Sequence, residues 1–472
     1  MIDLHSLTIK EARKHLDNKD FSVKELAGAY IEHISKINGD INAYLEIYDD
    51  VLAQAEIIDK NISASGAKTL TGIPIAMKDN ILIYGRHATS GSKILEGFVA
   101  PYDATVIKKL KEEGVVFLGR TNMDEFAMGS STENSAFGVT KNPIDKTRVS
   151  GGSSGGSAAT VAMDGALVSF GSDTGGSIRE PASFCGIVGL KPTYGSVSRY
   201  GLVALGSSLD VIGPFTKTVT DSEIVFDVIK GLDKFDSTTH DVTKNKDKKN
   251  IKVIGVPYHI LEKGGLSTEV LNNFNQSIQK LKDLGYEIRD IKLPNIEYSL
   301  AVYYILMPAE ASSNLARFDG VKYGLHVGGE NLLGDYLETR GQGFGKEVRR
   351  RILIGTYVLS SGYYDAYYNK ALMLRQKISE DFTKAFSVVD VIVTPTTPGP
   401  AFKIGERVND PLAMYLEDIF TVPANIVGLP AISIPSGFVD EDGISLPLGL
   451  QIIAPHDSEN LLFEVGKKFK GE

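Results

Sequence analysis

Disulfide pairs, membrane-spanning segments and an excess of basic residues are all missing from this sequence of 472 residues. The single cysteine, Cys185, has no partner within the chain, and such cysteine usage is typical of a reducing compartment. We therefore expect a cytoplasmic protein. Cys185 lies in the apolar stretch FCGIV, which favours a buried thiol over a nucleophile.

Long apolar runs are also absent. A membrane-spanning helix needs about 18 or more predominantly apolar residues in a row, and no part of the sequence supplies them. The segment 1–16 is charged and amphipathic and lacks the apolar core of a signal peptide. The sequence therefore predicts no contact with a membrane.

Basic residues number 50 against 59 acidic ones, which gives a formal net charge of −9. The longest basic stretch, KNKDKK at 244–249, is interrupted by Asp247 and is interpreted as a solvated loop. Proteins that grip a nucleic-acid backbone neutralise its phosphates with clustered lysine and arginine. We therefore expect this chain not to hold a nucleic acid alone.

The composition, 42% hydrophobic and 23% charged, is typical of a globular protein with a large core. The pairs Thr8 with Glu11 and Ser22 with Glu25 fit the capping box, and they predict two amphipathic helices, with helical residues continuing to about Lys60. We expect a helical section over 1–65 that packs on a domain over 66–472. A charged, Thr/Lys-rich segment at 236–250 is predicted to be a surface loop or an internal boundary.

Strands and helices alternate from Thr71 onward, which favours a mixed α/β sheet with helices on both faces. The expected strands lie at 72–77, 114–119, 166–170, 251–256, 286–291, 388–394, 431–434 and 448–454. The expected helices lie at 104–113, 158–163, 267–284, 347–386 (with a break at 361–362) and 458–469.

Two Gly/Ser clusters, at 151–157 and 173–177, flank a small apolar segment at 158–170. They predict two tight loops on a buried element, where glycine lets the backbone approach a ligand closely. The first cluster matches the nucleophile elbow G-x-S-x-G, but a polar loop precedes it where an elbow needs a buried strand. The phosphate-binding glycine patterns are absent. A purely structural turn remains an alternative.

A serine nucleophile with a lysine base is the remaining chemistry, since such pairs work without histidine. Lys78 ends the apolar run 73–77 and is the candidate base. Its pKa would have to fall from about 10.4 to about 7, roughly 4 kcal/mol, through burial and like charges. From its position alone, a solvated surface lysine is the more common case, and spacing cannot bring it beside Ser177.

The segments 151–157, 171–179 and 189–193, with Pro181, resemble the signature of the amidase signature family. The resemblance implies an amidase signature fold, with a large mixed central sheet flanked by helices, and a triad of serine, cis-serine and lysine. Lys78 matches the base, Ser153 the bridging serine beside a cis peptide, and Ser177 the nucleophile. The oxyanion hole maps to the N–H groups of Thr174, Gly175, Gly176 and Ser177. Asp173 and Arg179 are expected to brace the loop.

Within the family, the resemblance extends over nearly the whole chain to glutamine-hydrolysing subunits of tRNA-dependent amidotransferases. Members of this type hold glutamine with a tyrosine, an arginine and an aspartate, which map to Tyr303, Arg351 and Asp418. Tyr304 and Arg350 are adjacent alternatives. An arginine fork suits the carboxylate of a free amino acid, and an aspartate suits its ammonium.

The resemblance implies a heterotrimer that converts Glu-tRNA(Gln) to Gln-tRNA(Gln), or Asp-tRNA(Asn) to Asn-tRNA(Asn). A larger partner would use ATP and Mg2+ and bind the mischarged tRNA, and a small one would clamp the two. This chain would need no cofactor or metal. Two rival hypotheses are a stand-alone hydrolase of small amides and a non-catalytic scaffold subunit. Glu180, where related chains often carry glutamine, and Val211 depart from the family pattern; we expect neither to touch the triad.

Overall fold

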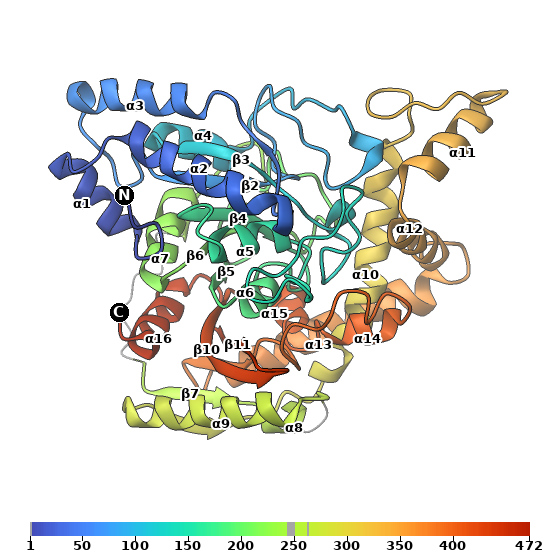
Figure 1. The fold of residues 1–472 in the computed structure, drawn as a ribbon. Coiled ribbons are helices and arrows are strands. Elements are labelled where there is room, and N and C mark those ends of the chain that lie inside the picture. Colours follow the sequence, from blue (N-terminus) through green and yellow to red (C-terminus); the bar gives the residue numbers. More distant parts are fainter. Residues whose placement is uncertain (1, 243–250, 262–263) are drawn as a thin grey trace.

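The computed structural model describes residues 2–242, 251–261 and 264–472, which form a large mixed sheet with helices on both faces (Figure 1). Within these residues, eleven strands follow the order β1-β3-β2-β4-β6-β5-β10-β11-β9-β7-β8. The expected α/β class is confirmed. The strands are β1 (Tyr44–Ile47), β2 (Pro74–Lys78), β3 (Val116–Thr121), β4 (Val168–Asp173), β5 (Val188–Lys191), β6 (Val211–Thr216), β7 (Val253–Val256), β8 (Glu287–Asp290), β9 (Val391–Pro395), β10 (Ala431–Glu441) and β11 (Ile444–Ile453).

The helices fall into an amino-terminal group, a set that alternates with the strands, and a group beyond one end of the sheet (Figure 1). They are α1 (Ile9–Asn18), α2 (Val23–Ile41), α3 (Val51–Ser65), α4 (Thr105–Glu113), α5 (Gly155–Ala162), α6 (Arg179–Cys185), α7 (Val219–Ile229), α8 (Tyr258–Leu261), α9 (Thr268–Asp283), α10 (Ser299–Asn314), α11 (Leu332–Gly343), α12 (Lys346–Val358), α13 (Lys370–Ala385), α14 (Pro411–Leu416), α15 (Val422–Val427) and α16 (Glu459–Lys470).

The amino-terminal section differs from the expected continuous helical stretch. Both capping boxes form, at the starts of α1 and α2. The helix then ends at Asn42, whose backbone is left-handed, and β1 pairs antiparallel with β3 at the sheet edge before α3 begins. The prediction of helix to about Lys60 is therefore wrong at β1, because pairing with β3 outweighs local preference. The division into 1–65 and 66–472 stays a prediction.

The centre of the sheet brings two strand ends together. β2 lies between β3 and β4 and runs parallel to both, with Met77 opposite Phe170. All residues of β2 and β4 are buried. Because parallel strands present their carboxyl ends at one edge of a sheet, Lys78 and Asp173 end up on the same side. The Gly/Ser clusters sit at this edge, one leading into the first turn of α5 and one between β4 and α6.

The predicted helical region 347–386 is divided, as expected, near Gly362. α12 ends at Val358, and a π-helical turn (Asp365–Asn369) leads into α13. Helices α10, α12 and α13 pack together at the right of the sheet in Figure 1. The predicted loop or boundary at 236–250 lies partly outside the described residues, which omit 243–250. In the residues described, no helix combines the length and apolarity needed to cross a membrane.

Candidate active site

Lys78 lies at the buried end of β2, fully enclosed by serines. Its Nζ lies 2.8 Å from Ser153 Oγ, 2.7 Å from Ser154 Oγ and 3.0 Å from Ser172 Oγ. The structure therefore brings Lys78 next to Ser153, which lies far from it in the sequence. The interpretation of Lys78 as a solvated surface residue is wrong, since none of its surface is exposed.

Burial lowers the pKa of Lys78 to about 7. The neighbouring charges act in the opposite direction, because Asp124, Asp173 and Asp210 are carboxyl groups that raise it. The expectation that like charges assist is thus wrong, and desolvation alone produces the shift. Near neutral pH a large fraction of the amine is uncharged and can accept a proton from Ser153.

Ser153 is held from its backbone as well as its side chain. The Gly152–Ser153 peptide bond is cis, as the resemblance implied. The carbonyl of Ser153 accepts a hydrogen bond from the N–H of Asp124 at 3.1 Å. The side chain of Asp124 in turn accepts from the N–H groups of Thr132 and Asn134. A buried hydroxyl beside an amine whose pKa is about 7 suits a proton relay.

Ser177 belongs to the loop that joins β4 to α6, and 8% of its surface is exposed. In the described chain, no hydrogen-bond partner is seen for the N–H groups of Thr174, Gly175, Gly176 and Ser177. Consecutive free amides are the donors that an oxyanion hole needs. The assignment of these four groups to an oxyanion hole stays a prediction.

Two glycines of this loop are fixed by their neighbours. A side chain at Gly175 would place its Cβ 2.7 Å from the ring of Tyr303. At Gly176, where φ is +151°, a Cβ would collide with Thr421 Oγ1. Close approach therefore requires glycine at both positions.

Asp173 and Arg179 form a fully buried ion pair behind the loop. The guanidinium donates to both carboxylate oxygens, at 3.1 and 3.0 Å. Although burial raises the pKa of Asp173, the Arg179 guanidinium brings it below its ordinary value. Arg179 also donates to the Thr421 carbonyl at 2.8 Å. The structure thus has the bracing contact that the resemblance implied.

The predicted substrate residues gather beside the same loop. Tyr303, on α10, packs against Gly175. Asp418, which follows α14, accepts a hydrogen bond from Ser130 Oγ at 3.0 Å, and the hydroxyl of Tyr304 lies 3.4 Å from the same oxygen. Burial raises the pKa of Asp418 to about 7. An incoming ammonium group would favour its charged form.

The two candidate arginines differ in burial. Arg351, on α12, is 3% exposed and donates to Glu347 at 2.8 Å. Its guanidinium lies 5.5 Å from the ring centre of Tyr304 and 5.6 Å from that of Tyr415. Arg350 is exposed and pairs with Glu347. Burial beside Tyr304 therefore favours Arg351 as the residue that meets a substrate carboxylate.

Sequence reasoning missed several residues that hold the site: Ser154, Ser172, Asp124 and Glu180. Ser172 could have been found, because it lies at the end of β4, next to the strand that carries Lys78. Glu180 accepts a hydrogen bond from the N–H of Gly152 at 2.8 Å. The departure at Glu180 thus lies directly against the loop of Ser153, although it contacts Gly152 and none of the triad residues.

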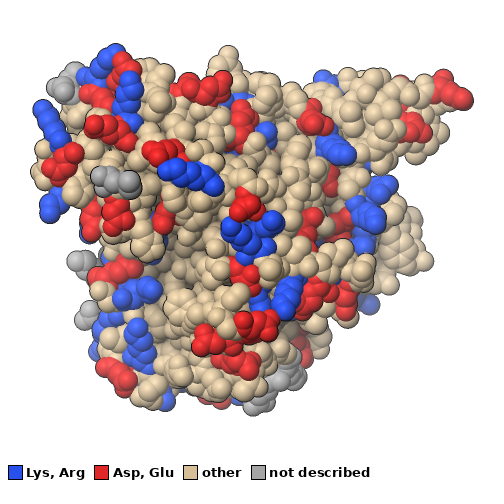
Figure 2. Space-filling view, viewed as in Figure 1, with Lys and Arg blue, Asp and Glu red and all other residues tan. Residues whose placement is uncertain are grey.

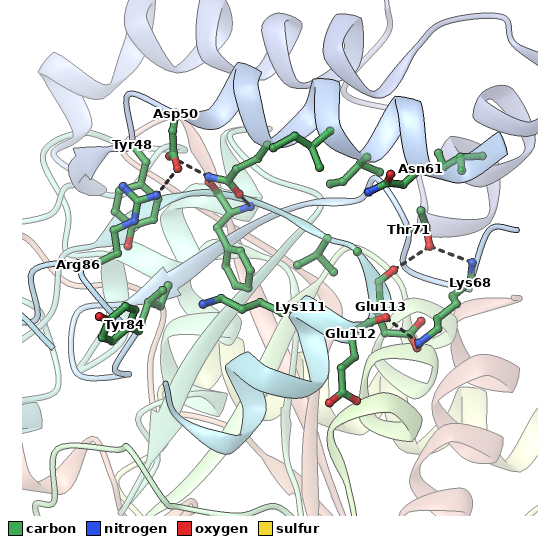
Figure 3. Close-up of a pocket in the computed structure, with 18 of the residues that line it drawn as sticks. Tyr48, Asp50, Asn61, Lys68, Thr71, Tyr84, Arg86, Lys111, Glu112 and Glu113 are labelled. Carbon is green, nitrogen blue, oxygen red and sulfur yellow. Dashed lines mark hydrogen bonds and ion pairs between the residues drawn. The ribbon is translucent and has the colours of Figure 1, made fainter. Parts of the chain in front are cut away.

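A cavity of about 570 Å³ lies between α3, α4 and the start of β3 (Figure 3). Figure 3 shows Arg86 directed at Asp50, and their atoms lie 2.5 Å apart. Lys111 pairs with Asp103 at 2.8 Å. None of the triad residues lines this cavity, and its arginine and this lysine are matched locally. It is therefore separate from the reactive groups.

The described residues contain no group of three His, Cys, Asp or Glu side chains arranged to hold a metal ion. Cys185 is buried, as expected, and its thiol contacts the Ser150 carbonyl at 3.3 Å. Burial raises the pKa of this thiol beyond the range in which a thiolate forms.

Fold and site together fit an amidase in which a lysine activates a serine, and the catalytic roles of Lys78, Ser153 and Ser177 stay predictions. The family model described as Amidase matches residues 25–463. The chain belongs to the amidase family, with the signature expected from its Gly/Ser clusters.

Individual proteins show which members of the family this chain is similar to. The chain is 54% identical to the A subunit of glutamyl-tRNA(Gln) amidotransferase from Thermoanaerobacter pseudethanolicus, covering 99% of this chain and 97% of that one. It is 42% identical to the solved structure of the corresponding A subunit from Thermotoga maritima, with a TM-score of 0.81 and coverage of 100% and 96%. It is also similar to the peptide amidase of Stenotrophomonas maltophilia, at 27% identity, a TM-score of 0.81 and coverage of 99% and 96%.

Proposed function

We propose that this chain is the glutamine-hydrolysing subunit of a tRNA-dependent amidotransferase. The observation that carries the proposal is a buried lysine, hydrogen-bonded to Ser153, close to a loop that packs against Tyr303 and lies near Asp418. The names of the most similar relatives support it. Lys78, Ser153 and Ser177 are all present, and Lys78 Nζ contacts Ser153 Oγ, which argues against a scaffold without catalysis.

The chemistry begins with attack of Ser177 Oγ on the side-chain amide carbon of glutamine. The hydroxyl proton passes to Ser153, whose own proton passes to the neutral amine of Lys78. The free amides of the 174–177 loop stabilise the oxyanion of the tetrahedral intermediate. Protonation of the amide nitrogen releases ammonia and leaves a glutamyl ester on Ser177. Water then hydrolyses the ester along the same proton route, yielding glutamate.

Glutamine recognition is assigned to groups at the free amino-acid end of the substrate. Arg351 would pair with the carboxylate and Asp418 with the ammonium, while Tyr303 closes the pocket against Gly175. Both charged groups are buried, which strengthens their contacts with a substrate. A hydrophobic amide would offer neither group a charged partner, so it would be disfavoured.

Ammonia would pass to a GatB-like subunit that activates Glu-tRNA(Gln) with ATP and Mg2+, and a GatC-like subunit would clamp the two. Figure 2 shows lysine and arginine interspersed with aspartate and glutamate on the visible face, without a broad basic surface. Such a face is a poor match for a phosphate backbone. The mischarged tRNA would therefore be held mainly by the GatB-like partner.

The direct test compares substrates. The chain, co-expressed with GatB-like and GatC-like subunits, should co-purify with them and hydrolyse glutamine, with ammonia release measured by a coupled assay. We expect hydrophobic amides to be hydrolysed at least about 100-fold less efficiently, because buried polar groups left unpaired disfavour the wrong substrate. Strong, partner-independent turnover of hydrophobic amides would instead support the stand-alone amidase.

The glutamine pocket is tested by Arg351→Lys. A lysine keeps the charge but loses the planar fork, so we expect KM for glutamine to rise by about 10- to 100-fold, with a smaller change in kcat. The matched control is Arg350→Lys on the exposed side of the same helix, which should leave KM within about twofold. Equal effects at the two positions would remove the assignment of Arg351.

A further inference from the structure

Glu180 links the two loops that carry the proposed serines. Its backbone N–H donates to the carbonyl of Gly176, next to Ser177, at 2.9 Å. Its side-chain Oε2 accepts from the N–H of Gly152, next to Ser153, at 2.8 Å. One residue thus contacts the neighbour of each serine.

Three hydrogen bonds hold Gly152 and Ser153, and they come from different parts of the chain. Glu180, on α6, holds the preceding amide, and the N–H of Asp124 holds the Ser153 carbonyl. Lys78, on β2, holds the hydroxyl. Of these, only Glu180 also bonds to the loop of Ser177. Its side chain is therefore placed to set the position of one serine relative to the other.

The surroundings of Glu180 disfavour a charge. The side chain is fully buried, and Oε1 has no hydrogen-bond partner among the described residues. Burial, with Asp418 and Asp124 nearby, raises the pKa of its carboxyl well above the ordinary value. Arg407 acts weakly in the other direction, and the adjacent Cys185 thiol is itself uncharged. An anion here would lack an ion pair in the described chain.

We propose that Glu180 is a positioning residue, whose carboxyl fixes the Gly152 amide and thereby holds Ser153 in line between Ser177 and Lys78. The inference rests on the triad of the proposed function. A neutral carboxyl offers one oxygen as acceptor and one hydroxyl as donor. The side-chain amide of glutamine likewise offers an acceptor oxygen, with an NH2 group as the donor. Position, and not charge, is what this residue supplies.

The test compares Glu180→Gln, which keeps the acceptor, with Glu180→Ala, which removes it. Glu459, at the start of α16, is the matched control. It is also buried, and its carboxyl accepts a hydrogen bond from the N–H of Thr193 at 2.8 Å. Each variant is purified as the complex. The first readout is the rate at which phenylmethanesulfonyl fluoride labels Ser177, followed by intact mass. The second is kcat and KM for glutamine.

We expect Glu180→Ala to slow both labelling and kcat by about 10- to 100-fold, since small displacements of reacting groups have effects of this size. KM should change less than about threefold, and Glu180→Gln should restore both rates at pH 7.5 to within about twofold. Glu459→Ala should label at the wild-type rate. The wild-type rate should fall as high pH ionises Glu180, whereas Glu180→Gln should keep its rate there.

Three results would overturn the inference: wild-type labelling by Glu180→Ala, equal losses in Glu180→Gln and Glu180→Ala, or no labelling of the wild type. Should Glu180→Ala fail to fold, a pH profile of Glu180→Gln that superimposes on the wild type also overturns it. A complex that is labelled at Ser177 but does not hydrolyse glutamine removes the proposed function alone, because the labelling rates still measure the role of Glu180.

Discussion

The Ser177→Ala complex is expected to lose glutamine-dependent amidation of tRNA by about 10⁴-fold or more, a loss typical of removing the nucleophile from a catalytic serine. Without Oγ no glutamyl ester can form, although glutamine can still bind. Amidation supplied with ammonium chloride should remain near the wild-type rate, because that route bypasses Ser177. The measurement is the yield of Gln-tRNA(Gln) with each nitrogen donor.

Ser183→Ala is the control for this prediction. Ser183 lies on α6, is 2% exposed and contacts Thr397 Oγ1 at 3.3 Å, away from Lys78. Removing its hydroxyl should leave both donors active. Glutamine-dependent amidation that survives in Ser177→Ala would show that the nucleophile is elsewhere, and loss of the ammonia-dependent reaction would indicate damage to the complex.

Lys78→Met should lower kcat for glutamine by about 10³-fold, within the range that general-base catalysis contributes. Methionine fills the buried site without a group that accepts the proton of Ser153. The pH profile gives a second readout. Because burial lowers the pKa of Lys78 to about 7, the uncharged base predominates above pH 7, and kcat at saturating glutamine should fall as pH drops below it. That acid limb should be absent from the residual activity of Lys78→Met.

Lys191 provides an unusually close control. It ends β5, is 1% exposed, and burial lowers the pKa of its amine to about 7 as well. Its Nζ donates to the carbonyl of Pro192 at 2.9 Å instead of to a serine. Lys191→Met should keep kcat within about threefold and retain the acid limb, because it lies outside the relay. A similar loss in both variants would mean that a buried lysine stabilises the fold and takes no part in the reaction.

Periodicity and capping chemistry were enough to predict much of the framework. The capping boxes of α1 and α2, the buried strand β2, and α9 between β7 and β8 follow from local patterns. The strand β1 could not be predicted, because only its pairing with β3 makes it a strand. For the same reason β5 and β6, which are short and held by their neighbours, had no separate signal.

The residues of the candidate site also fall into those that could be predicted from the sequence and those that could not. Lys78 was a candidate base from its position, but its grouping with Ser153 and Ser177 was predicted only through resemblance to a family, since no spacing rule places residue 78 beside residue 153. The three serines around Lys78 Nζ depend on the parallel register of β2 and β4, which is a property of the folded sheet. The contact of Glu180 with Gly152 depends on how α6 meets the first loop, and nothing in the local sequence indicates it.

The reactive and the recognising groups come from separate stretches of the chain. The proton route draws on strands and loops between residues 74 and 180, whereas Tyr303, Arg351 and Asp418 are carried by helices α10 and α12 and the segment after α14. The two sets meet at the glycines of one loop, where Tyr303 packs against Gly175. The helices that carry the predicted substrate residues can therefore change in evolution while the reactive residues stay the same. In this fold, a change of substrate does not require a change of reaction mechanism.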